Sequence, residues 1–291
     1  MRSPLFQVWT FGRSTPSSIQ NHWSFNPDNG FNARTVAMAR VNGKSYNLIA
    51  DPVAGQMDAE QVAVVVGATR TELQYSLQPA DGTNESGALA NIQINMTFTS
   101  ALIPSDIQAY MDPVVYVTFH ATNMGSQAAD VEVMFGVTGE LLVSQPAPET
   151  GVTPGPHATG ARESACNDTD WDVSFQETEV QAGAWAGGAS NELLRAARIG
   201  HARQNPLCSL GDLTKGNWGW QYLVPVTSES TKTSSAAPGD VSICTGCGLR
   251  TSAEAFVTLG DVGNTTDLEN PRPFNQGLNR EPAVLVSAKL G

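Results

Sequence analysis

Two cysteines near the carboxyl end of the chain, in the segment Cys244-Thr245-Gly246-Cys247, have the C-x-x-C spacing of residues that can do chemistry. Such a pair can carry out thiol–disulfide exchange, supply half of a zinc site or form a short structural disulfide. Redox use is expected at a helix N-terminus in a strand–helix–strand setting, which this sequence does not indicate. A zinc site usually has a second close pair of ligands. The two other cysteines, Cys166 and Cys208, lie 42 residues apart.

The even number of cysteines favours disulfides formed in an oxidising compartment. Four cysteines allow three pairings. We favour Cys244 with Cys247 and Cys166 with Cys208, and the sequence leaves the other two pairings open.

Three carboxylates alternate in the segment Asp168-Thr169-Asp170-Trp171-Asp172, which resembles the start of a calcium loop. An EF-hand loop needs glycine at its sixth position, where this chain has Val173. Asp168, Asp170 and Asp172 therefore remain a calcium candidate, and a solvated strand edge is the alternative that the sequence favours. The four histidines are scattered, and no nucleophile elbow, phosphate-binding loop or dinucleotide fingerprint is present. We expect no cofactor and no catalytic residue in this chain.

Four sequons of the form Asn-x-Ser/Thr make N-glycosylation possible if the chain is secreted. Their asparagines are Asn84, Asn95, Asn167 and Asn264. Together with the cysteines they predict an extracellular or cell-surface location. The segment at Met1 lacks the apolar region of a signal peptide, so either a signal precedes this numbering or none exists.

Composition excludes several classes of function. The 291 residues are 41% hydrophobic and 15% charged, which is typical of a folded globular chain. The net charge of −12, from 16 basic and 28 acidic residues, argues against nucleic acid as a partner. No run of apolar residues is long enough to span a membrane, so we expect no membrane partner.

Strand patterns dominate the elements that would position these residues. The clearest is Ile92, Ile94, Met96 and Phe98, which alternate with polar residues and predict one buried face with Asn95 on the opposite, solvated one. Asn42-Gly43 predicts a two-residue hairpin turn. The other expected strands are 35–39, 44–49, 69–78, 114–121, 130–137, 171–180 and 218–226, and 145–160 and 228–239 are expected loops. The only helix-like stretch is 191–201, where helix and strand are equally favoured. The sequence thus predicts one all-β domain over 1–291, a large and mainly antiparallel β-sandwich with little helix.

Several segments, in order along nearly the whole chain, resemble the amino-terminal domain of the glutaminase A family. The opening Arg2-Ser3-Pro4-Leu5-Phe6-Gln7-Val8-Trp9 is similar to that family's "RSPYLQTW", and Val41-Asn42-Gly43-Lys44-Ser45-Tyr46 is similar to its "VDGKTY". Phe98-Thr99-Ser100 with Ile103-Pro104-Ser105-Asp106 resembles "FLSP…PxD". Leu210-Gly211-Asp212 with Asn217-Trp218-Gly219-Trp220-Gln221-Tyr222-Leu223 resembles "GD…DWGYLYL", with Asn217 in place of the usual Asp. Asn270-Pro271-Arg272-Pro273 and Ala288-Lys289-Leu290-Gly291 resemble "FPRPIN…AxDLG".

The resemblance implies a β supersandwich that is followed, after Gly291, by a helical toroid holding the catalytic groups. The chain would then be a non-catalytic accessory domain of a secreted amidohydrolase that converts L-glutamine to L-glutamate and ammonia. Its partner would be that toroid, in the same or a processed polypeptide. Two alternatives remain: a carbohydrate-binding or carbohydrate-processing module, marked by exposed aromatics such as Trp171, Trp185 or Trp220, and a stand-alone extracellular structural protein.

Overall fold

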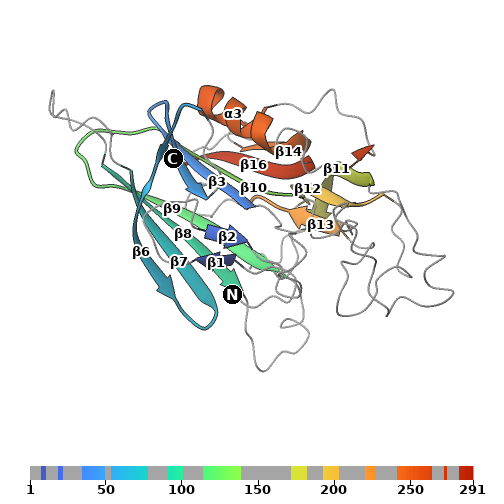
Figure 1. Ribbon diagram of the computed structural model, residues 1–291, viewed down its shortest axis with the longest axis horizontal. Helices are drawn as coiled ribbons and strands as arrows, with labels where there is room; N and C mark the ends of the chain where they lie inside the picture. The colour runs from blue at the N-terminus through green and yellow to red at the C-terminus, as the bar shows by residue number, and fades with distance from the viewer. Residues whose placement is uncertain are drawn as a thin grey trace, which may run out of the picture.

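The computed structural model shows an all-β, sandwich-like fold of mainly antiparallel strands with one described helix (Figure 1). This confirms the predicted fold class. The structure describes residues 8–10, 19–21, 35–49, 54–77, 91–100, 114–138, 172–181, 193–202, 220–226, 241–263, 272–273 and 282–290.

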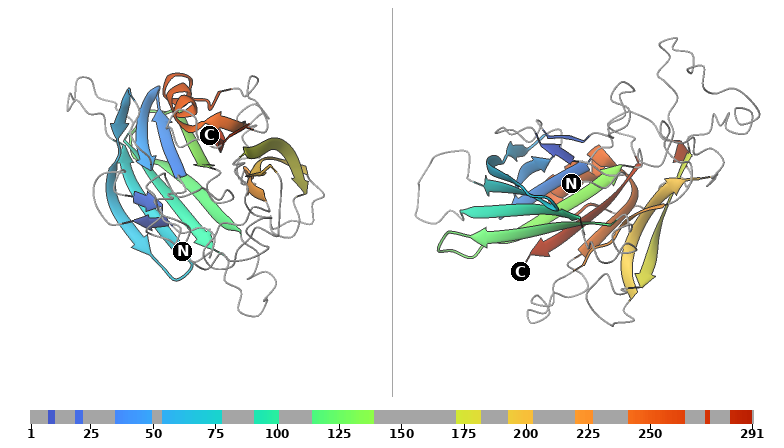
Figure 2. Two further views of the ribbon diagram at one scale, coloured as in Figure 1. Left: turned by 45° about the vertical axis from the view of Figure 1, so that its right-hand side comes forward. Right: turned by 90° about the horizontal axis from the view of Figure 1, so that it is seen from below.

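Three larger sheets and a two-stranded ribbon account for the strands. The ribbon pairs β1 (Val8–Thr10) with β2 (Ile19–Asn21). The sandwich has a six-stranded sheet in the order β14-β16-β10-β3-β4-β5, formed by Val241–Gly248, Pro282–Leu290, Val131–Thr138, Thr35–Val41, Lys44–Ile49 and Gln56–Asp58. It also has a four-stranded sheet in the order β6-β7-β8-β9, formed by Glu60–Val66, Arg70–Leu77, Ile92–Ser100 and Val115–Asn123. The third sheet has the order β13-β12-β11-β15, formed by Trp220–Leu223, Leu193–His201, Asp172–Gln181 and Arg272–Pro273. We call these three the six-stranded sheet, the meander sheet and the lateral sheet; Figure 2 shows the lateral sheet beside the other two.

The predicted hairpin turn at Asn42-Gly43 joins β3 to β4. Both residues have positive φ angles, 49° and 82°, as a type I′ turn requires. Asn42 also holds the chain before β10: its N–H donates to the Asp130 carbonyl oxygen at 3.0 Å, and its Oδ1 accepts from the Asp130 N–H at 2.9 Å. The turn residue therefore fixes the register of three neighbouring strands.

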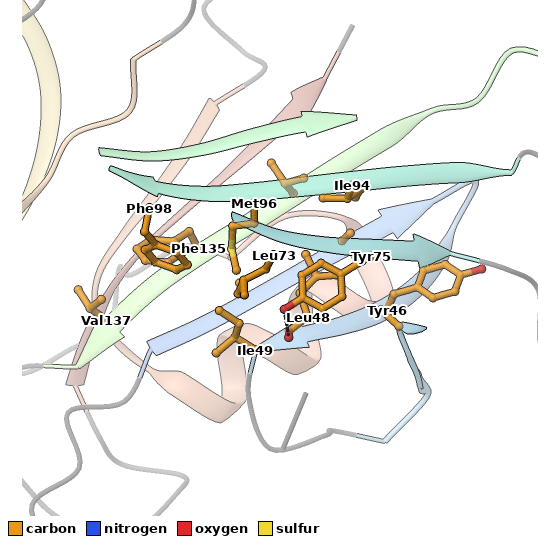
Figure 3. Packing of buried hydrophobic residues seen from close by; sticks show 14 of the residues in the cluster. Tyr46, Leu48, Ile49, Leu73, Tyr75, Ile94, Met96, Phe98, Phe135 and Val137 are labelled. Atoms are coloured by element: carbon orange, nitrogen blue, oxygen red, sulfur yellow. Dashed lines mark hydrogen bonds between the residues drawn. The ribbon is translucent and has the colours of Figure 1, made fainter. Parts of the chain in front are cut away.

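The main core lies between the six-stranded sheet and the meander sheet (Figure 3). Ile92, Ile94, Met96 and Phe98 have no exposed surface, which confirms the predicted buried face of β8. The ring of Phe98 meets that of Phe135 from β10 edge to face, with centroids 6.4 Å apart. Fully burying side chains of this size contributes about 1.5–3 kcal/mol each, so this face is a major source of stability.

Helix α3 (Leu249–Leu259) covers the other face of the six-stranded sheet (Figure 1). Successive side chains of β3, β10 and β16 point to opposite faces of the sheet. Met38, Met134 and Leu285 point to the helix, while their neighbours point to the sandwich core. Phe256 of α3 is fully buried in this second cluster. The chain is therefore layered as helix, sheet and sheet.

The prediction that 191–201 was the only helix-like stretch was wrong. Strand β12 occupies 193–201, paired on both sides by β11 and β13, because tertiary pairing overrides helix propensity there. Helix α3 was missed because Gly248 at its N-cap makes no side-chain capping bond. The spacing of Leu249, Ala253 and Phe256, with Gly260 after them, was the available signal.

An ion pair secures the carboxyl end of α3. Arg40 on β3 pairs with Glu132 on β10 at 2.7 Å and also donates to the Thr258 carbonyl oxygen at 3.4 Å. Gly260 ends the helix with a φ of 77°, and its N–H donates to the Phe256 carbonyl oxygen. A Cβ at Gly260 would overlap the Glu132 carboxylate, so glycine is required both by the backbone conformation and by the approach of this side chain.

The remaining predicted strands appear close to their expected positions, as β7, β9, β10, β11 and β13. The expected loops 145–160 and 228–239 lie outside the described residues. Within the described residues, the helix found has 11 residues, and none is long and apolar enough to cross a membrane.

Candidate functional site

A β-bulge at Gly246 brings the two cysteines of the C-x-x-C segment to one face of β14. In a regular strand, residues three apart point to opposite faces. Here Cys244 pairs with Leu285 and Cys247 with Ala283 of β16, and the register shifts between Thr245 and Cys247. The extra residue, Gly246, has a φ of 67°. The structure joins Cys244 to Cys247 by a disulfide, with Cα atoms 5.9 Å apart.

Both cysteines are enclosed in the apolar cluster under α3. Cys244 is 1% exposed and Cys247 is 6% exposed. The sulfur of Cys244 lies 3.9 Å from the Ser252 hydroxyl, in the first turns of the helix. A buried disulfide in such a setting can hold the bulge and the start of α3 in place. Exchange with a soluble thiol would require this cluster to open.

The structure also places a helix directly after the C-x-x-C segment, which the sequence did not indicate. Cys247 is followed by the N-cap Gly248 and by α3. Strand β14, which contains both cysteines, is antiparallel to its neighbour β16, so the setting is not a strand–helix–strand unit with parallel strands. Cys166 and Cys208 lie outside the described residues.

The calcium candidate is described only in part. Asp172 begins β11, opposite Pro273 of β15, and Asp168 and Asp170 lie outside the described residues. In the described part of the chain, no three His, Cys, Asp or Glu side chains come together in a group that could hold a metal ion.

Asn95 lies on the outer face of the meander sheet, opposite the core. It is half-buried there, between Gln74 of β7 and His120 of β9 in the ladder. Thr97, which completes the sequon, lies two residues after Asn95 in the same strand and therefore shares this face. His120 is exposed, as expected for a histidine on the solvated face of its strand. The other sequon residues, Asn84, Asn167 and Asn264, lie outside the described residues.

A second constellation, which the sequence did not single out as a group, lies on the outer face of the lateral sheet. Gln176 of β11, Arg198 of β12 and Tyr222 of β13 are direct cross-strand neighbours, so they form one row across three strands. The Arg198 guanidinium donates a hydrogen bond to the Gln176 side-chain oxygen and lies 4.3 Å from the centre of the Trp220 ring. Tyr222 is 45% exposed. The signal available in the sequence was Trp220-Gln221-Tyr222, whose aromatics share a face of an edge strand.

Residues on the inner face of the same strands explain this orientation. Phe175, Ile199 and Leu223 belong to or pack against the main core. Alternation then directs Gln176, Arg198 and Tyr222 outward. Trp220 lies opposite Gly200, which has no side chain to occupy the space beside the indole. Trp220, one of the aromatics that would mark a carbohydrate-binding module, is thus on an outer face, where it is half-buried. The other two, Trp171 and Trp185, lie outside the described residues.

The fold and these sites define a layered β-sandwich with a covering helix, a buried disulfide and an aromatic edge. Comparison of the chain with protein-family models, curated proteins and solved structures finds no match.

Proposed function

We propose that the chain is a non-catalytic accessory module of a larger secreted hydrolase of the glutaminase A type. The ordered resemblance of its segments to the amino-terminal domain of that family motivates the parent activity on L-glutamine. The β-sandwich fits the expected architecture. In this proposal the module packs against a helical catalytic domain and shapes the edge of its cleft.

The exposed edge strand β6 is the observation that carries the docking part of the proposal. Val62, Val65 and Val66 are 50%, 48% and 71% exposed. Strand β6 is the outermost strand of the meander sheet, with β7 as its described partner. An apolar edge strand with unpaired backbone groups is prone to pair with another chain unless it is covered. A partner domain along β6 would remove that liability, and a stable interface would bury about 1,000 Å² or more.

The catalytic part is tested by measuring ammonia release from L-glutamine by the purified 291-residue chain. We expect no release above the buffer background, because the proposal places the nucleophile, proton donor and oxyanion donors in the partner domain. Turnover that disappears on substitution of a residue within the chain would overturn the accessory role.

The docking part is tested by sedimentation of the same chain over a range of concentrations. With β6 uncovered, we expect self-association that Val65→Lys abolishes, since a lysine on an edge strand opposes strand pairing. Thr118→Lys is the matched control, because Thr118 lies on the same outer face at the opposite edge of the sheet. A chain that stays monomeric, or equal effects of the two lysines, would remove β6 as the interface and favour a stand-alone extracellular protein.

A further inference from the structure

The outer face of the lateral sheet brings together side chains that can contact a ligand. It combines an exposed aromatic ring, Tyr222, with an arginine, Arg198, that is fixed by its neighbours. It lies at the opposite end of the molecule from β6 (Figure 1), so its role is independent of the docking proposal.

Arg198 differs from the other arginines whose side chains the structure describes. Each of those four forms an ion pair with a carboxylate: Arg40 with Glu132, Arg70 with Glu72, Arg195 with Glu177 and Arg250 with Glu254. Arg198 has no carboxylate partner among the described residues, although the chain as a whole carries a net charge of −12. The pair of Glu177 with Arg195 lies on the other face of the sheet, because Glu177 stands opposite Ala197 while Arg198 stands opposite Gln176. Among the residues that the structure describes, the positive charge of Arg198 is therefore not balanced by a paired carboxylate.

The position of Arg198 is set before any ligand arrives. Gln176 accepts its hydrogen bond on one side, and the Trp220 ring supports the guanidinium by a cation–π contact. The Nε atom of Arg198 is buried and has no hydrogen-bond partner in the described structure. An arginine held in this way loses little conformational entropy when it binds a carboxylate.

We propose that this surface binds an acidic sugar, a pyranose that carries a carboxylate. The apolar face of the sugar ring would pack on Tyr222, and the carboxylate would accept hydrogen bonds from the Arg198 guanidinium. The side-chain amide nitrogen of Gln176 would donate to a hydroxyl of the sugar ring, because the amide oxygen already accepts from Arg198. A neutral sugar would use the aromatic surface but leave the charge of Arg198 unmatched.

The test is calorimetric titration of the full 291-residue chain with trigalacturonate, and with its methyl ester as the uncharged counterpart. We expect binding of trigalacturonate and at least about tenfold weaker binding of the ester, because a charge-assisted arginine–carboxylate pair is lost. Tyr222→Ala and Arg198→Gln should each weaken trigalacturonate binding by at least about tenfold. Tyr116→Ala is the matched control, since Tyr116 is 38% exposed on the meander sheet, and it should leave binding unchanged.

Each other outcome counts against the site. Absence of measurable binding, or equal binding of the acid and its ester, would overturn the proposal of an acidic sugar. Unchanged binding by Tyr222→Ala would show that the ligand sits elsewhere. Since Arg198→Gln could loosen the Trp220 contact, Arg198→Lys is included. Lysine keeps the positive charge but lacks the planar guanidinium. If Arg198→Lys still binds trigalacturonate and Arg198→Gln does not, the site recognises the carboxylate by charge alone.

Discussion

The ring of Phe175 lies directly against Gly246, the bulge residue between the two cysteines of β14. A Cβ at position 246 would overlap the ring atoms of Phe175. This contact is one of those that join the lateral sheet to the six-stranded sheet, because Phe175 belongs to β11 and Gly246 to β14. Gly246 therefore contributes to three features: the bulge, the position of both cysteines on one face of β14, and the close approach of Phe175 from the lateral sheet.

Replacing Gly246 with alanine should destabilise the protein strongly. The positive φ of 67° costs a non-glycine residue about 1–2 kcal/mol, and overpacking against a buried ring adds about 1–3 kcal/mol. Urea unfolding followed by circular dichroism measures the loss. Gly43→Ala is the control, because Gly43 also has a positive φ but its Cβ would lie 3.7 Å from the nearest atom. Equal losses at the two glycines would show that the Phe175 contact contributes nothing.

Removing the disulfide should cost about 2 kcal/mol, near the lower end for native disulfides, because the loop it closes is only a few residues long. The double substitution Cys244→Ser and Cys247→Ser, compared by urea unfolding with the parent under non-reducing conditions, measures this cost. When the parent protein is denatured without a reducing agent, neither Cys244 nor Cys247 should react with a thiol reagent. Two free thiols there, trapped under denaturing conditions and located by peptide mass analysis, would exclude the disulfide.

Tyr75 should make stability fall at high pH. Its hydroxyl donates to the Leu48 carbonyl oxygen at 3.0 Å in the core, and burial raises the pKa of Tyr75 well above its usual range. A raised pKa in the folded state means that the stabilising contribution is complete below about pH 10, where an unfolded tyrosine is also protonated. Above that pH the unfolded chain releases the proton first, so the free energy of unfolding falls by about 1.4 kcal/mol per pH unit.

The measurement is the unfolding free energy of the parent and of Tyr75→Phe at pH 7 and between pH 10 and 12. At pH 7 the phenylalanine variant should be less stable by about 0.5–1.5 kcal/mol, because one hydrogen bond is lost. The difference should shrink as the pH rises above 10 and then reverse. A constant difference across this range would show that Tyr75 titrates normally.

Short-range patterns predicted much of this fold. The alternation in β8 and the Asn42-Gly43 turn need only local geometry, and both appear as expected. The nature of β12 could not be settled locally, because its side-chain pattern fits a helix as well as a strand until β11 and β13 pair with it.

The sites were less accessible from sequence for the same reason. The spacing of Cys244 and Cys247 suggests proximity, but the bulge that turns both to one face depends on pairing with β16. The row of Gln176, Arg198 and Tyr222 joins three strands far apart in the chain, so its register becomes visible only in the sheet. The order of segments that resembles the glutaminase A family motivates a parent activity, which stays a proposal.

The face assignment of β8 gives a final prediction. Phe98 has no exposed surface and contacts Phe135, so Phe98→Ala should lower the unfolding free energy by about 3–5 kcal/mol. Thr97→Ala, one residue away on the outer face, should change it by less than about 1 kcal/mol, since little apolar contact is lost. Thermal and urea unfolding of the two variants provide the comparison. A shift of the register by one residue would exchange the two faces and with them the two results. A large loss at Thr97 with a small one at Phe98 would therefore contradict the packing of the meander sheet against the six-stranded sheet.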